Sequence, residues 1–130
     1  MRRLILFAIT AMLLVCASGY AHHSYAATYD TTKEIKLSGK LVQFSLKNPH
    51  SYVTIQAPDA KGNMQRWSIE WAGTSQLNSR GITNDTLKIG DQVNIVGRPS
   101  RVAGEFKALM VTLKRPSDGV SWGTSGEIVE

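Results

Sequence analysis

The chain has 130 residues, which indicates a single domain with enough length for one hydrophobic core. It carries 15 Lys and Arg against 10 Asp and Glu, a formal net charge of +5 at pH 7. These charges are dispersed, whereas nucleic-acid binders gather theirs on one face, so the composition argues against a nucleic-acid partner.

The first 21 residues have the three parts of a secretory signal peptide. Met1–Arg3 is basic, Leu4–Val15 is almost wholly apolar, and Gly19-Tyr20-Ala21 is a small-x-small cleavage site. An uncleaved membrane anchor is the alternative, but the apolar run is short for a bilayer and polar residues follow it. We therefore expect residues 1–21 to be removed, leaving a periplasmic or secreted protein with no transmembrane span.

Cleavage after Ala21 also removes Cys16, the only cysteine. Val15 precedes it, where lipoprotein signals need a small residue, so lipidation is not expected. The mature chain then has neither a disulfide nor thiolate chemistry. Arg2 and Arg3 leave with the leader, so 13 basic residues face 10 acidic ones and the net charge is +3.

Residues 22–34 form an N-terminal extended segment. Tyr25, Ala27 and Tyr29 alternate with small residues, which predicts an irregular edge strand. The turn-forming residues 30–32 follow.

A clear β pattern begins at Lys33. Apolar residues alternate up to Leu41, and their phase then slips by one residue at Val42, which indicates a β-bulge. Asn48-Pro49 ends this strand because proline cannot donate to a ladder. Strands over 52–56 and 64–71, separated by a polar loop, then form a hairpin.

Gly73–Gly81 has the pattern of a short helix, with Thr74 as N-cap and Gly81 as the residue after the C-cap. Residues 83–86 predict a second helical turn. Strands over 92–97 and 106–113 complete the pattern, the latter with Leu109, Val111 and Leu113 inward. Residues 116–130 are expected to be a loosely ordered tail.

The element order β-β-β-α-β-β predicts an all-β fold with one short helix, an OB-fold-like five-stranded Greek-key barrel over residues 35–115. A small open β-sandwich is the alternative. The predicted interior consists of nine apolar residues: Val53, Ile55, Trp67, Ile69, Trp71, Val93, Ile95, Val111 and Leu113.

Short motifs recur in a fixed order along the mature chain. They are Ala21-His22-His23-Ser24, Tyr29-Asp30, Gly39, Asn48-Pro49-His50, Trp67-Ser68-Ile69-Glu70-Trp71, Gly73-Thr74, Arg80-Gly81, Leu87–Asp91 and Val93–Gly97. From His22 to about Leu113 the chain resembles the bacterial exported domain-of-unknown-function family 6152; the tail after Arg115 matches only loosely. The resemblance implies an exported β-barrel-like domain and no known activity.

The three histidines are the residues most suited to chemistry. Cleavage after Ala21 gives His22 a free α-amine beside its imidazole, a chelate that favours Cu(II). His23 adds a second imidazole, and the N-terminal segment is long enough to return to His50 at the corner after the first strand. We predict a metal site of His22, His23 and His50 with copper preferred and zinc as the alternative. Glu70, Asp30 or Tyr25 can orient an imidazole.

No other pattern indicates catalysis, so an enzyme is not expected. The mature chain lacks a nucleophilic cysteine, a nucleophile elbow and a phosphate-binding loop. Glu70 is expected on the outer face of its strand, in a solvated ion pair with Arg66. The alternative to a metal protein is a metal-free module that binds an envelope protein or a small ligand.

Overall fold

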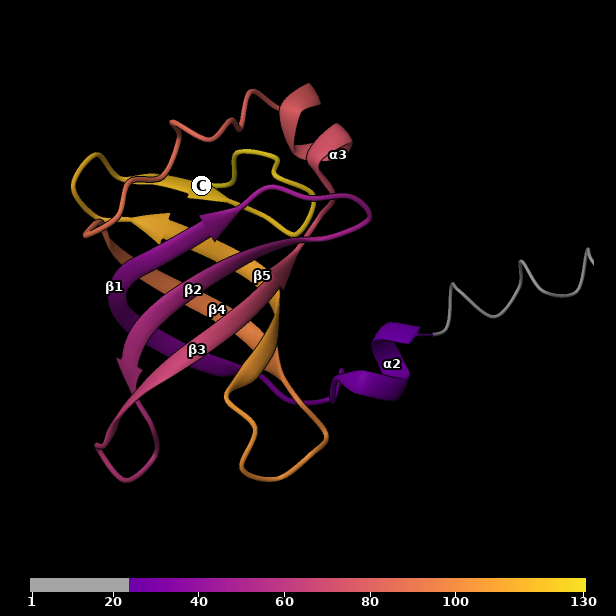
Figure 1. Ribbon diagram of the computed structural model, residues 1–130, viewed down its shortest axis with the longest axis vertical. Coiled ribbons are helices and arrows are strands. Elements are labelled where there is room, and N and C mark those ends of the chain that lie inside the picture. Colours follow the sequence, from indigo (N-terminus) through magenta and orange to yellow (C-terminus); the bar gives the residue numbers. More distant parts are fainter. Residues whose placement is uncertain (1–23) are drawn as a thin grey trace, which may run out of the picture.

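The computed structural model describes residues 24–130, and its elements are shown in Figure 1. Within these residues, two short helices and six strands follow one another. They are α2 (Ser24–Thr28), β1 (Ile35–Ser45), β2 (Ser51–Pro58), β3 (Met64–Trp71), α3 (Thr74–Ser79), β4 (Gln92–Pro99), β5 (Lys107–Arg115) and β6 (Val120–Trp122).

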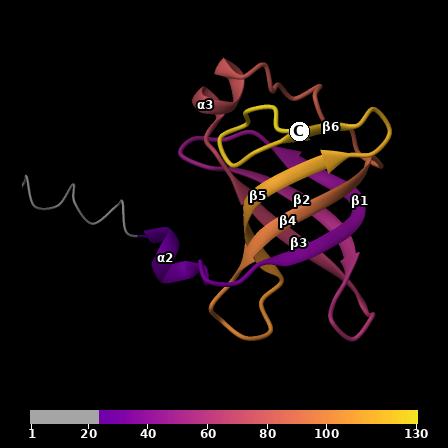
Figure 2. The ribbon, with the colours of Figure 1, turned by 180° about the vertical axis from the view of Figure 1, so that it is seen from behind.

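The strands form one sheet in the order β3-β2-β1-β4-β5-β6, and a parallel pairing between β3 and β5 closes the first five into a barrel. Figure 2 shows the rear wall, where β1, β4 and β5 lie side by side. The prediction of an OB-fold-like five-stranded barrel is therefore confirmed. The open sandwich is excluded because β3 and β5 share ladder hydrogen bonds.

The bulge predicted in the first strand is also confirmed. Leu41 pairs with Ile55 and Gln43 with Thr54, so Val42 is the extra residue. Gly39 permits the bend, since a Cβ at this position would lie 2.1 Å from the carbonyl oxygen of Gln56.

Eight of the nine predicted interior residues are buried, and Val111 is the exception. Gly97 pairs with Met110 while Val96 pairs with Thr112, so Val111 is the extra residue of a second bulge. The bulge changes which alternate residues of β5 face the barrel interior, and the buried ones are Ala108, Met110 and Leu113. The prediction that Leu109 and Val111 point inward was therefore wrong, and the prediction for Leu113 was correct.

Helix α3 lies over one end of the barrel, and its Leu77 is fully buried (Figure 1). Its N-cap is Gly73, without a side-chain hydrogen bond, so the prediction of Thr74 as N-cap was wrong. Gly81 has φ +82°, as the residue after a helix C-cap requires, and its prediction is confirmed. Residues 83–86 form a hydrogen-bonded turn and no second helix.

Two predictions near the chain ends were wrong. The expected edge strand at 25–29 is helix α2 as far as Thr28, and only Tyr29 forms a β-bridge, with Ser100. The tail is not loosely held: β6 pairs with β5, Trp122 is 5% exposed, and the Trp71 indole N–H donates to the carbonyl of Gly123. Within residues 24–130 no helix is long and apolar enough to cross a membrane.

Candidate functional site

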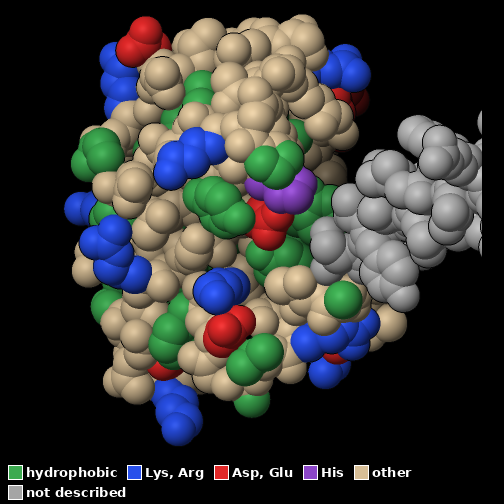
Figure 3. All heavy atoms as spheres, turned by 45° about the vertical axis from the view of Figure 1, so that its right-hand side comes forward, with side chains coloured by type: hydrophobic (Ala, Val, Ile, Leu, Met, Phe, Trp, Pro, Cys, Tyr) green, Lys and Arg blue, Asp and Glu red, His purple; other side chains and the backbone are tan. Residues whose placement is uncertain are grey.

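His50 stands at the corner between β1 and β2, directly after the cis Asn48–Pro49 bond. Its side chain is 30% exposed. Figure 3 shows the histidine (purple) at the surface, in contact with an acidic side chain and surrounded by hydrophobic groups. His22 and His23 lie outside the described residues.

Glu70 is the acidic partner of His50. It lies on β3 between the buried Ile69 and Trp71 and so points out of the barrel, yet it is only 8% exposed. Nδ1 of His50 lies 2.6 Å from Oε1 of Glu70, and the Tyr29 hydroxyl donates to Oε2 at 2.5 Å. The predicted solvated ion pair with Arg66 was therefore wrong, because the N-terminal segment covers the carboxylate.

The contact with Glu70 determines which ring nitrogen of His50 remains available as a ligand. An ionised carboxylate can only accept hydrogen bonds, so Nδ1 must carry the proton in this pair. In the neutral imidazole, Nε2 then holds the lone pair. A histidine held by a carboxylate through one nitrogen is the usual arrangement when the other nitrogen ligates a metal.

Tyr25 of α2 packs on the same imidazole. The two ring centroids are 5.0 Å apart with the planes tilted by 42°. Of the three residues predicted to orient a histidine, Glu70 and Tyr25 contact His50. Asp30 instead accepts hydrogen bonds from Thr32 within its own turn, which together with Lys33 lower its pKa to about 2.

The tyrosines of this site remain neutral at ordinary pH. Burial raises the pKa of Tyr29 well above its usual value of 10, and its hydrogen bond to Glu70 raises it further. Burial also raises the pKa of Tyr25, and the charge of Glu70 adds to this. Tyr29 therefore acts as a hydrogen-bond donor to Glu70, and Tyr25 as a packing group against His50.

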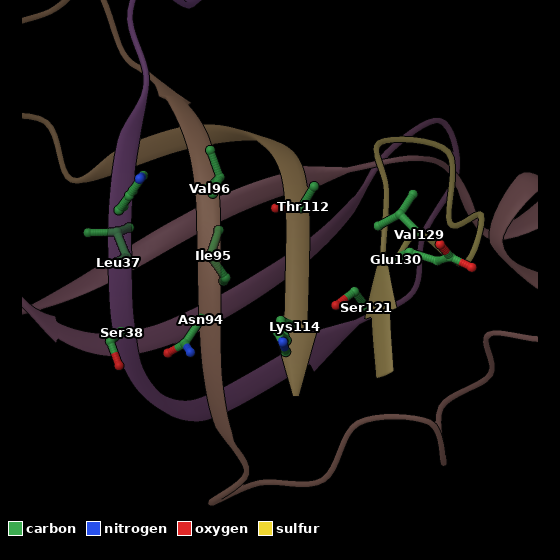
Figure 4. Close-up of a pocket in the computed structure, with 11 residues that line it drawn as sticks. Leu37, Ser38, Asn94, Ile95, Val96, Thr112, Lys114, Ser121, Val129 and Glu130 are labelled. Atoms are coloured by element: carbon green, nitrogen blue, oxygen red, sulfur yellow. The ribbon is translucent and has the colours of Figure 1, made fainter. Parts of the chain in front are cut away.

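A cavity of about 300 Å³ adjoins His50 and Glu70. Its other lining residues include Tyr25, Pro49, Gln76 of α3 and Thr124 of the C-terminal loop. A second cavity, of about 450 Å³, lies on the outer face of β1, β4, β5 and β6 and contains no histidine (Figure 4). Of these two cavities, the one beside His50 is lined by a histidine and a carboxylate.

Among residues 24–130, no group of three or more His, Cys, Asp and Glu side chains could bind an ion. His50 is thus a single candidate ligand with an orienting carboxylate. Tyr29, which completes that arrangement, was missed because its burial depends on contacts with strands far along the sequence.

No curated protein matches the chain. Among solved structures, it is similar to the mitochondrial single-stranded DNA binding protein Rim1 of S. cerevisiae, with 13% identity, a TM-score of 0.46, and coverage of 65% of this chain and 93% of that one. The family described as "Family of unknown function (DUF6152)" matches residues 11–108, three quarters of the sequence. The chain belongs to this family.

Proposed function

We propose that the protein is exported and binds a metal ion, preferably Cu(II), through His22, His23 and His50. The α-amine and imidazole of His22 would supply two ligands, and Nε2 of His50 a ligand fixed by the barrel. The observation that supports this most is the contact between His50 Nδ1 and Glu70, which leaves Nε2 free.

The position of Tyr25 supports the meeting of the three histidines. Its ring packs on His50, and His23 precedes it by only two residues. Consecutive Cα atoms are about 3.8 Å apart, so the Cα of His23 lies within about 8 Å of that of Tyr25. This short covalent link would let the N-terminal histidines approach His50.

The ligand set favours copper. It would consist of nitrogen atoms from imidazoles and an amine, which suit the tetragonal geometry of Cu(II), and Cu(II) binds such sites more tightly than the other divalent first-row metals. Zinc with three imidazoles and a water is the alternative. An exported protein that begins at His22 is a premise of this proposal, and the mass of the mature protein tests it.

The decisive experiment is a Cu(II) titration of protein that begins at His22, with Zn(II) in parallel. We expect sub-micromolar Cu(II) binding that weakens in His50→Ala, in His22→Ala and in protein whose N-terminal α-amine is acetylated. Lys47→Ala, near the same corner, is the control and should bind as wild type does. Equal affinity in wild type and in His22→Ala/His50→Ala would refute the proposal.

The second candidate is a metal-free module that binds a small polar ligand or an envelope protein. The 300 Å³ cavity beside His50 favours it, because Gln76 and Glu70 line that space with polar groups. A partner retained from an envelope extract in the presence of chelator, and lost in Gln76→Ala, supports this candidate. A partner retained only with metal favours the metal site.

A further inference from the structure

Trp67 of β3 belongs to the core of the barrel, near the end opposite α3. Two loops lie at this end: residues 59–63 join β2 to β3, and residues 100–106 join β4 to β5 (Figure 1, Figure 2). Trp67 is 9% exposed. Its indole packs edge to face on Phe106, with the ring centroids 5.2 Å apart.

The indole N–H of Trp67 is a buried donor without an acceptor. Among the side chains of residues 24–130, Nε1 of Trp67 is the one buried nitrogen or oxygen that forms no hydrogen bond. By contrast, the indole N–H of Trp71 donates to the carbonyl of Gly123 at 3.0 Å. An indole nitrogen only donates, and a buried one usually has a partner. An acceptor oxygen brought to Trp67 would therefore be bound favourably.

Two cavities adjoin this side chain. The larger, of about 480 Å³, has Trp67 and Phe106 in its wall and is called the Trp67 cavity below. The smaller, of about 260 Å³, is also lined by Trp67 and extends to Ile35 of β1. Asp59 and Ala60 line both. A space of a few hundred Å³ with aromatic walls is typical of a small-molecule site.

The charged groups around the Trp67 cavity balance one another. Asp59 accepts two main-chain N–H groups of its own loop, and Lys61 lies close enough to act on its charge. Glu105 accepts from the Ser100 hydroxyl and forms an ion pair with Lys107 at 3.3 Å. A charged ligand would gain no net attraction here, so the cavity suits a neutral one. A carbonyl oxygen is the usual neutral acceptor for an N–H group.

A ligand reaches the indole nitrogen only when the two loops separate, because that nitrogen is covered. Within the described residues, no hydrogen bond or ion pair links loop 59–63 to loop 100–106. Each loop is closed by its own main-chain bonds: the N–H of Asp59 donates to the carbonyl of Asn63, and that of Glu105 to the carbonyl of Val102. The loops therefore move apart without breaking a bond between them.

We propose that the Trp67 cavity binds a small, neutral, mainly apolar molecule that carries a carbonyl oxygen. The apolar part would pack on Trp67 and Phe106, and the oxygen would accept from the indole N–H. This cavity shares no lining residue with the one beside His50. The proposal is therefore independent of the proposed metal site.

Two probes of nearly the same shape test the hydrogen bond. Acetophenone has a carbonyl oxygen, and α-methylstyrene has a methylene group in its place. Both are titrated into the purified protein in the presence of EDTA, and proton–nitrogen correlation NMR follows the amides of the two loops and the indole N–H groups. Acetophenone should bind at least about 10-fold more tightly. Trp67→Phe keeps an aromatic ring without the donor, so it should lower acetophenone affinity to that of α-methylstyrene.

Tyr52→Phe is the matched control. It also removes one polar group from an aromatic side chain, but Tyr52 is exposed and lines neither cavity. Both affinities should change less than about two-fold. In wild-type protein, acetophenone should shift the indole resonance of Trp67, assigned through its contact with Phe106, more than those of Trp71 and Trp122. This readout needs no variant, so it decides the matter even if Trp67→Phe does not fold.

Three results would overturn the proposal. The first is that acetophenone does not bind up to its solubility limit or binds no better than α-methylstyrene. The second is a preference for acetophenone that persists in Trp67→Phe, since the oxygen would then have another donor. The third is binding that leaves the Trp67 indole resonance in place. None of these results bears on the metal site, because EDTA is present throughout.

Discussion

Glu70 binds two partners with one carboxylate, and its replacement should affect both the site and the fold. In Glu70→Gln one oxygen becomes an amide nitrogen, so His50 Nδ1–H and the Tyr29 hydroxyl can no longer both donate to this side chain. We expect Cu(II) affinity to fall about 10- to 100-fold and the free energy of unfolding to fall by about 1–3 kcal/mol. Metal titration and urea unfolding measure these effects.

Glu34→Gln is the matched control, since Glu34 is exposed just before β1. It should leave the metal affinity and the free energy of unfolding unchanged within about 0.5 kcal/mol. If Glu70→Gln and Glu34→Gln behave alike, the carboxylate does not orient His50.

Tyr29 should make the fold sensitive to alkali. Burial and the bond to Glu70 raise its folded-state pKa above the value of 10 in the unfolded chain. The stability that it contributes is therefore fully present below pH 10 and is lost as the pH rises above 10. Urea unfolding from pH 7 to 11 should show the gap between wild type and Tyr29→Phe closing above pH 10. A gap independent of pH would contradict this.

The sequence predicted on which face of β3 the side chain of Glu70 lies, but not which residues cover that side chain. Alternation along β3 correctly placed it opposite Ile69 and Trp71. A period of two says which face a residue occupies, and does not say what covers that face. The cover comes from Tyr29, 41 positions earlier in the chain. The carboxylate was therefore mistaken for a solvated group.

The two elements misjudged near the chain ends are both short. Tyr25 and Tyr29 are four residues apart, a spacing that fits one face of a strand and also one face of a helix, so the pattern alone could not distinguish them. β6 has three residues in a polar, glycine-rich stretch. Longer strands such as β3 repeat their pattern often enough to be predicted from sequence.

The β6 strand should contribute measurably to stability through Trp122. This side chain packs in the core, and the next residue accepts the hydrogen bond of the Trp71 indole. Trp122→Ala should lower the free energy of unfolding by about 3–5 kcal/mol in urea titrations. Ile128→Ala is the control: Ile128 is 73% exposed and should cost less than about 0.5 kcal/mol. Similar small losses in both would mean that the tail packs loosely.

For the whole molecule, the closure of the barrel was predicted because the order of strands and helix matches that of an OB-fold. No pattern of residues along the strands indicated it. β3 and β5 pair over three residue pairs only, and these lie about 40 positions apart in sequence, as in Glu70 with Leu109. No local signal encodes a parallel pairing at that separation. Glu70 belongs to this seam, so the candidate site stands where the barrel closes.

The position of His50 on the folded barrel determines how metal binding should change the stability of the whole chain. A ligand stabilises a protein only as far as it prefers the folded state. In the proposed mature protein the terminal chelate of His22 would exist in the unfolded chain too, so metal held there alone would give little stabilisation. Only folding would bring His50 to that chelate, and coordination by both would link metal binding to the fold.

We therefore expect Cu(II) to raise the Tm of wild-type protein by several degrees, up to about 10 °C at 100 times Kd. A chelator should reverse the shift. His50→Ala should still bind Cu(II) at its terminus, more weakly, but show almost no rise in Tm even when saturated. Thermal unfolding followed by circular dichroism measures the shifts. An equal rise in both proteins would show that His50 is not a ligand, because metal binding would then stabilise the fold without it.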